Sequence, residues 1–340
     1  MSHFTVMIAG ENIEEQLRPF QENNMGDCPQ EYLEFNDIEA ECTKDYKTDT
    51  TSVFISPDGK AYFKYDGQFR NATTGESECP TGWATDDEYP VKDLYSLEEY
   101  IEDYVGYKKD DITGKYGYWE NPNAKWDWYQ VGGRWAGMFK IKPEYQELYI
   151  DKVPNFSWGW DEESKREVFK NIKVDSAVKK HIDFEAIMYE AGEKARGEYR
   201  KYRPFLDIGD REFIPWSLYL ERVNDENDDL EREEARNLYH GQPQIIAKKE
   251  NCDKLGDQSV FVNLGDFYNI TEEEYVENAR IDSLMTFAFI KDGKWCERGK
   301  MGWFACVSDE KDKETWESIF KKFIDGIGED EVLTVVDCHI

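Results

Sequence analysis

Two histidines and one aspartate lie at opposite ends of the chain, in segments that both favour β-strand. His3 opens the segment HFTVMIAG, residues 3–10, while Asp337 and His339 lie in the closing segment EVLTVVDCHI, residues 331–340. Both segments are rich in β-branched residues. Two imidazoles and a carboxylate supply either three ligands for a divalent metal ion or an acid–base pair with a carboxylate that orients it. These three residues are therefore the candidate catalytic residues and the candidate metal ligands.

The pairing of the two terminal strands decides whether these side chains can meet. If the first and last strands pair antiparallel, His3 becomes the neighbour of His339. Side chains alternate along a strand, so Asp337 and His339 share one face. We expect the apolar face that carries Phe4 and Ile8 to pack on helices, which leaves the three polar residues together on the other face. The alternatives are strand-end residues in contact with solvent, or a hydrogen-bonded cluster that ties the termini together.

A second cluster is the stretch KWDWYQVGGRWAG, residues 125–137, in which an aspartate and an arginine stand among three tryptophans. A core strand rarely has this composition. The Gly-Gly pair permits a bend that displays Arg134, and a guanidinium held by aromatic faces can still bind a carboxylate or phosphate. The alternative is a bent core strand in which Arg134 pairs with Asp127 and the tryptophans are buried. The candidate ligand-binding residues are Trp126, Asp127, Trp128, Arg134, Trp135 and, as a further wall of the pocket, Trp303.

The order of the expected elements predicts an α+β fold. Residues 3–20 have the pattern of a strand followed by a helix. Residues 283–340 have the pattern of a hairpin over Asp292-Gly293, a helix with apolar residues at helical spacing, and a final strand. Together the two ends spell βα–ββαβ, the element order of a ferredoxin-like unit. A long mixed insertion, first β and then α, separates its first helix from its second strand.

The same patterns divide the chain into three segments. Residues 1–24 and 283–340 form the predicted ferredoxin-like terminal domain. Residues 25–150 form a β-rich insertion that carries the tryptophan-rich motif, and residues 151–282 form a mainly helical, acidic region. This division places the two candidate sites in different domains.

Charge and cysteine content narrow the classes of function. The chain has 73 Asp and Glu against 42 Lys and Arg, a formal charge of −31, and no basic stripe, so we expect no direct binding to nucleic acid. The first residues resemble neither a signal peptide nor a membrane span, which predicts a cytoplasmic protein without membrane association. The seven scattered cysteines include no CxxC pair and fit free thiols in a reducing compartment.

Several blocks along the chain resemble a family of uncharacterised proteins encoded by bacteriophages, prophages and plasmids. The blocks are the MSHFTV start, NPNAKWDWYQVGGRWAG, IDFEAIMYEAGEKA, KDGKWCERGKMGWFACVSDEKD with its ERGKMGWF core, and the terminal LTVVDCHI. The resemblance implies an origin in a mobile genetic element and a location in the cytosol of the bacterial host. The family has no established activity, so it assigns no catalytic residue.

Two hypotheses from different classes follow. In the first, a phage-encoded accessory protein binds or processes a small anionic, nucleotide-like ligand: the tryptophans stack on it, Arg134 contacts its anion, and His3, Asp337 and His339 supply the chemistry or hold a divalent metal. In the second, the protein is not an enzyme and its acidic surface binds and inhibits a bacterial host protein, as a counter-defence or host-takeover factor. The oligomeric state is left open.

Overall fold

The computed structural model describes residues 2–154, 163, 168, 171–226, 228–302, 304 and 306–340. The chain divides into two compact units, one formed by Met1–Gln16 with Trp128–Ile340 and the other by Leu17–Asp127. This division differs from the three predicted segments. The boundary falls inside the tryptophan-rich motif, because the strand that begins at Trp128 joins the sheet of the first unit.

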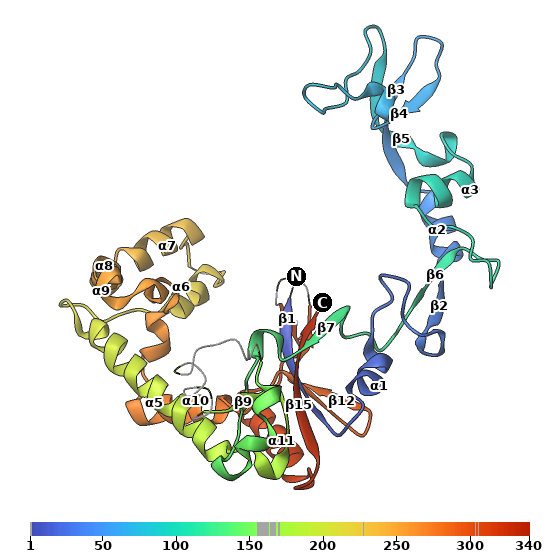
Figure 1. Cartoon of the computed structure of the whole chain (residues 1–340). Helices are drawn as coiled ribbons and strands as arrows, with labels where there is room; N and C mark the ends of the chain where they lie inside the picture. Colours follow the sequence, from blue (N-terminus) through green and yellow to red (C-terminus); the bar gives the residue numbers. More distant parts are fainter. Residues whose placement is uncertain are drawn as a thin grey trace. The chain divides into compact units, whose positions relative to one another are not determined.

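A six-stranded sheet organises the first unit and is built largely from the two chain ends (Figure 1). Its strands are β1 (His3–Ala9), β7 (Trp128–Val131), β10 (Ser176–Val178), β11 (Ala288–Lys291), β12 (Lys294–Glu297) and β15 (Val332–His339). The order is β10-β15-β1-β11-β12, and β7 also pairs with β15. Only the β1–β11 pair is parallel. The predicted antiparallel pairing of the first and last strands is therefore confirmed.

The predicted α+β class and the element order at the two ends are also present. Strand β1 is followed by α1 (Ile13–Leu17), and the hairpin β11–β12 is followed by α11 (Lys313–Asp325) and β15. The ferredoxin-like arrangement is not confirmed, because that arrangement places the third strand of the unit beside the first, whereas here the second strand, β11, lies beside β1. The physical reason is burial: Ala288 and Ile290 of β11 are fully buried, while β12 is only partly buried at the edge of the sheet.

Helix α11 covers one face of the sheet. Trp316, Phe320 and Phe323 of α11 belong to the same buried cluster as Met7 and Val335. Because side chains alternate, this is the face that also carries the three candidate catalytic residues: Asp337 lies two positions, and His3 and His339 four positions, further along the strands. The expectation that helices pack only on the Phe4 and Ile8 face is therefore wrong for α11. Helix α11 packs on the part of this face that carries Met7 and Val335, and the candidate residues lie beyond it.

Six helices lie between Phe184 and Asp282 in the described part of the chain. The helices are α5 (Phe184–Tyr202), α6 (Trp216–Val223), α7 (Arg232–His240), α8 (Pro243–Glu250), α9 (Cys252–Leu255) and α10 (Glu272–Asp282). The Asp183 side chain caps α5 by accepting a hydrogen bond from the backbone N–H of Ala186 at 3.0 Å. The small residue Gly192 lets α5 approach Val276 and Arg280 of α10 closely. Short strands complete this unit: β8 (Phe139–Lys140) pairs with β9 (Lys173–Val174), and β13 (Lys300–Met301) pairs with β14 (Val307–Ser308).

The second unit is rich in short strands, as expected for the first part of the insertion. Its strands are β2 (Glu34–Asp37), β3 (Thr50–Ile55), β4 (Ala61–Phe63), β5 (Ala84–Pro90) and β6 (Gly117–Glu120). Strands β4-β3-β5 form one small sheet and β2-β6 form another. The helices α2 (Glu39–Tyr46) and α3 (Leu97–Glu99) complete the unit. No helix in the described part of the chain is long and apolar enough to cross a membrane.

Candidate functional site

The end of the β1–β15 pair brings the three candidate catalytic residues together. His3 lies opposite His339 in the register, and Thr5 lies opposite Asp337. Nδ1 of His3 is 2.8 Å from Oδ1 of Asp337, and the two side chains are 12% and 3% exposed. A carboxylate only accepts hydrogen bonds, so Nδ1 of His3 carries the proton and donates it. Nε2 of His3 then lies on the far side of the ring from Asp337.

The Gly-Gly bend supplies a second donor to the same carboxylate. After β7 the chain turns at Gly132, with φ 72° and ψ −70°, and at Gly133, with φ 54°. This turn directs the backbone N–H of Arg134 to Oδ2 of Asp337 at 3.0 Å. A Cβ atom at Gly133 would lie only 2.4 Å from Cβ of Asp337. The absence of a side chain at this position is what allows the close approach of the bend to the strand.

A second carboxylate, Asp175, holds the other end of the bend. Its Oδ1 accepts a hydrogen bond from the backbone N–H of Gly137 at 2.6 Å. Its Oδ2 would lie 2.3 Å from a Cβ atom at Gly132. Burial raises the pKa of the Asp175 carboxyl above its ordinary value of 3.8, and the bond from Gly137 opposes part of this shift. Sequence reasoning missed Asp175, although its position between the apolar residues Val174 and Ala177 was a signal, since a carboxylate there needs a partner.

Aromatic rings cover the histidines from the outer edge of the sheet. Trp128 of β7 pairs with His339 and stacks on its ring, with centroids 5.0 Å apart and planes 18° apart. His3 meets both rings edge-on, at 5.3 Å from Trp128 and 5.0 Å from His339. Trp128 is 43% exposed, whereas His339 is only 4% exposed. His339 is therefore packed beneath the tryptophan, and the alternative of a solvent-wetted strand end does not hold for it.

The arrangement does not gather metal ligands. Among the residues that the structure describes, no group of three or more His, Cys, Asp or Glu side chains could hold a metal ion. The geometry gives the reason, since Nδ1 of His3 already faces the carboxylate and the two imidazole planes stand 74° apart. The geometry therefore favours proton transfer over metal binding at these residues.

The predicted ligand-binding residues are divided between the two units. Trp126 belongs to the second unit, where it is 5% exposed and its Nε1 donates to the carbonyl oxygen of Leu17 at 3.0 Å. This tryptophan is a core residue, as the alternative interpretation proposed. Asp127 also belongs to the second unit. Trp135 is half-buried against the core of the first unit. Trp303 lies outside the described residues.

Trp128 and Arg134 are the members of that set that stay close to the His3–Asp337 pair. Arg134 is exposed, and within the described ranges no ion pair of its guanidinium is present. Its backbone N–H is held by Asp337, and its side chain is exposed. One end of the sheet thus holds the imidazole of His3, which the buried carboxylate of Asp337 orients. The partly exposed Trp128 and the exposed Arg134 belong to the same end. Such a set can exchange a proton with a ligand and bind its anionic and planar parts.

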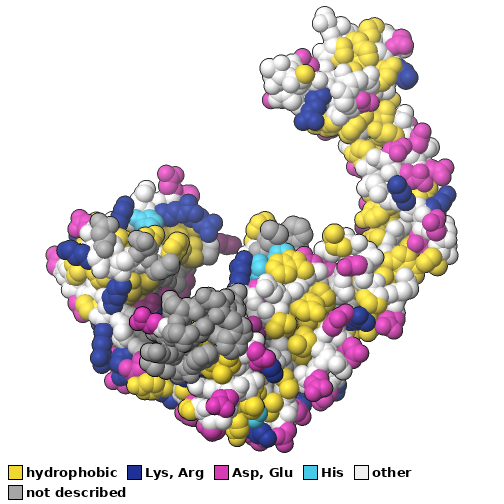
Figure 2. All heavy atoms as spheres, viewed as in Figure 1, with side chains coloured by type: hydrophobic (Ala, Val, Ile, Leu, Met, Phe, Trp, Pro, Cys, Tyr) yellow, Lys and Arg dark blue, Asp and Glu magenta, His cyan; other side chains and the backbone are white. Residues whose placement is uncertain are grey.

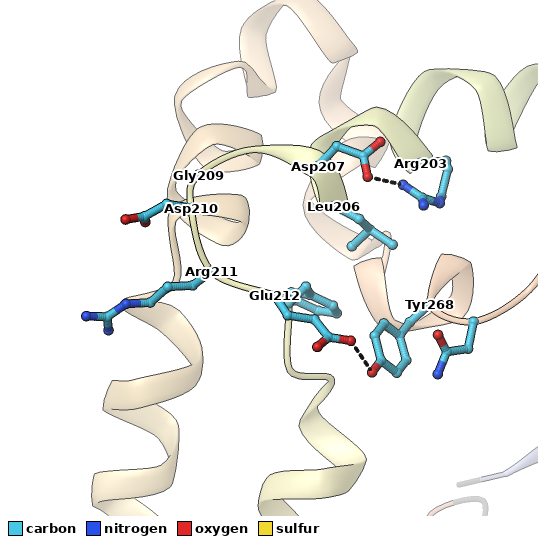
Figure 3. A pocket seen from close by; sticks show the side chains of 10 residues that line it. Arg203, Leu206, Asp207, Gly209, Asp210, Arg211, Glu212 and Tyr268 are labelled. Atoms are coloured by element: carbon cyan, nitrogen blue, oxygen red, sulfur yellow. Dashed lines mark hydrogen bonds and ion pairs between the residues drawn. The ribbon is translucent and has the colours of Figure 1, made fainter.

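A polar hollow of 380 Å³ elsewhere in the first unit contains none of the predicted site residues (Figure 3). Its charged groups are largely paired with each other: Arg203 binds Asp207 at 2.9 Å, and the hydroxyl of Tyr268 donates to Glu212 at 3.1 Å. Figure 3 shows the side chain of Arg211 pointing away from these pairs. Because these charged groups pair with each other, we assign no function to this hollow.

The fold and the site together define an α+β protein with a carboxylate–imidazole pair at paired chain termini. No known protein family, curated protein or solved structure matches the chain. The resemblance to proteins of mobile genetic elements therefore stays a prediction from the sequence.

Proposed function

We propose that the protein binds a small anionic, nucleotide-like ligand at the end of the β1–β15 pair and that His3 exchanges a proton with it. The observation that carries this proposal is the buried carboxylate of Asp337, which accepts one bond from His3 and one from the backbone of Arg134. Burial of a carboxylate is costly unless it is fully hydrogen-bonded. Here the bonds that satisfy it also fix the orientation of an imidazole and of the bend that bears an arginine.

Each residue has a distinct role in this proposal. His3 is the proton-exchanging group, because Nδ1 faces Asp337 and Nε2 is directed away from it. Asp337 is a positioning residue that selects the tautomer of His3. Trp128, which is 43% exposed and contacts both histidines, offers its exposed part to a planar ring. Arg134 binds the anion, because a guanidinium forms paired hydrogen bonds with a phosphate or carboxylate.

The test measures equilibrium binding of the four ribonucleoside monophosphates to the full-length protein, with ligand-observed NMR as the readout. We expect Arg134→Ala and Trp128→Leu each to weaken binding by about tenfold, the value of one charged hydrogen bond or one stacked ring. Arg211→Ala is the matched control, because that arginine is also exposed and in the described ranges forms no ion pair. Retention of full affinity in both site variants would refute the proposal, as would the absence of binding to the native protein.

The role of His3 requires a separate readout. His3→Gln keeps a hydrogen-bond donor near Asp337 but cannot titrate. We expect this variant to bind the same ligand about tenfold more weakly, because it loses the imidazole nitrogen that faces away from Asp337. An unchanged affinity would show that His3 does not contact the ligand.

A further inference from the structure

A shallow hollow on the helical region combines cationic and aromatic groups that no part of the proposed function uses. Its volume is 290 Å³, and its lining is Trp216, Arg232, Arg236, Tyr239 and His240. Four of these residues come from α7, and Trp216 opens α6. Figure 2 shows Lys and Arg side chains gathered beside a histidine over this part of the molecule.

The spacing of the cationic groups follows from helix geometry. Arg232, Arg236 and His240 are four residues apart, so they form one stripe along α7. Cβ atoms at this spacing are about 6 Å apart, which lets two guanidinium groups contact one phosphate or two linked phosphates. The three side chains are exposed. His240 adds ring nitrogens at the end of the stripe.

Where the structure describes the chain, the two arginines of this stripe are unpaired, although the chain is acidic. The chain carries 73 acidic residues, yet in the part of the chain that the structure describes neither Arg232 nor Arg236 forms an ion pair. The nearby Arg222 shows the common outcome for this region, because it binds Asp228 at 2.7 Å. Glu233 precedes Arg236 by three residues and so neighbours it on the helix surface, but among the described residues no ion pair joins the two. Two guanidinium groups on one face of α7 are therefore left to bind an external anion.

The lining of the hollow also includes aromatic rings beside the two arginines. Trp216 and Tyr239 meet at 5.6 Å between ring centroids, and Tyr239 meets His240 at 5.3 Å. Burial raises the pKa of Tyr239 above its ordinary value of 10.0. Its hydroxyl already donates to Oδ1 of Asn263 at 3.5 Å, so the ring of Tyr239 is what the hollow offers to a ligand. Trp216 is only half-buried, so part of its ring is open to a ligand.

We infer that this hollow is a second, separate site, which binds a phosphorylated small molecule with an aromatic ring, such as a nucleoside polyphosphate. Arg232 and Arg236 bind the phosphates, and Trp216 stacks on the ring. The negative field of the whole protein repels anions, so affinity depends on these local contacts and falls as either guanidinium is removed. The inference stands independently of the site at the chain termini.

The test is fluorescence anisotropy of a labelled adenosine triphosphate with the full-length protein, in the absence of divalent metal. Unlabelled ATP, inorganic phosphate and adenosine compete in separate arms. We expect saturable binding with a Kd below about 1 mM, a loss of about tenfold in affinity for Arg232→Gln or Arg236→Gln, and stronger competition by ATP than by inorganic phosphate or adenosine. Lys194→Gln is the charge-matched control, because Lys194 is exposed on α5 and outside the hollow.

The outcomes separate this site from the one at the termini. Trp128 lies outside the hollow, so a loss of ATP binding in the Arg232 and Arg236 variants but not in Lys194→Gln assigns that binding to the hollow. The inference is overturned if the native protein does not bind ATP, if the arginine variants bind as tightly as Lys194→Gln, or if Trp128→Leu rather than the arginine variants abolishes binding. Equal competition by inorganic phosphate and ATP would remove the aromatic part of the inference and leave a simple phosphate site. Far-UV circular dichroism of each variant confirms that it is folded.

Discussion

Addition of one methyl group at Gly133 tests whether Asp337 holds the bend that carries Arg134. Gly133 has φ 54°, and an alanine at such a φ costs about 1–2 kcal/mol of strain. The new Cβ would lie 2.4 Å from Cβ of Asp337, far inside normal contact, so the bend must move away from β15. This movement breaks the 3.0 Å bond from Arg134 to Asp337, which contributes about 1.5–3 kcal/mol as a bond to a charged group. We expect Gly133→Ala to destabilise the first unit by about 3–5 kcal/mol.

Gly293→Ala is the matched control for this change. Gly293 has φ 69° in the β11–β12 hairpin of the same unit, and a Cβ atom there would meet nothing within 4 Å. Gly293→Ala should therefore lower the free energy of unfolding only by the backbone strain, about 1–2 kcal/mol. Urea unfolding gives the total for each variant, and amide hydrogen exchange of β15 locates the loss in the first unit. If Gly133→Ala costs no more than Gly293→Ala, the bend does not depend on Asp337 and our account of the site is wrong.

Three further changes probe the same region. Asp337→Ala should cost about 2–4 kcal/mol in urea unfolding, because it leaves two partly buried donors, Nδ1 of His3 and the backbone N–H of Arg134, without their acceptor. Asp337→Asn should cost clearly less because the amide oxygen still accepts from Arg134, and equal losses would contradict this. The raised pKa of Asp175 means that the folded state holds its proton more tightly than the unfolded state, so this group makes stability fall as the pH rises above 3.8. Asp175→Asn keeps an acceptor for Gly137 and should flatten the pH dependence of the melting temperature, whereas an unchanged slope would assign that dependence to other groups. His339→Ala should cost about 2–3 kcal/mol because the ring is buried, and a loss under about 1 kcal/mol in urea unfolding would indicate a wetted ring.

The local elements of the fold could be predicted because their signals are local. Alternation in residues 3–10 and 331–340 marks strands, and a side-chain cap at Asp183 marks the start of α5. The strand order could not be predicted, because either strand of the β11–β12 hairpin can pair with β1 without a change in local sequence. Burial of Ala288 and Ile290 on one face of β11 accompanies its central place, and burial is a property of the assembled sheet.

For the candidate site, the sequence by itself determined that His3, Asp337 and His339 meet, because antiparallel pairing and the period of two fix neighbours and faces once the terminal strands pair. It also indicated that the Gly-Gly bend serves a special contact. Only the tertiary structure decided which residues share that contact: it brought the bend onto Asp337, separated Trp126 into another unit, buried His339 under Trp128 and added Asp175. The physical reason is that these contacts join segments more than 30 residues apart, whose approach depends on the packing of the whole sheet and leaves no periodic trace in the sequence.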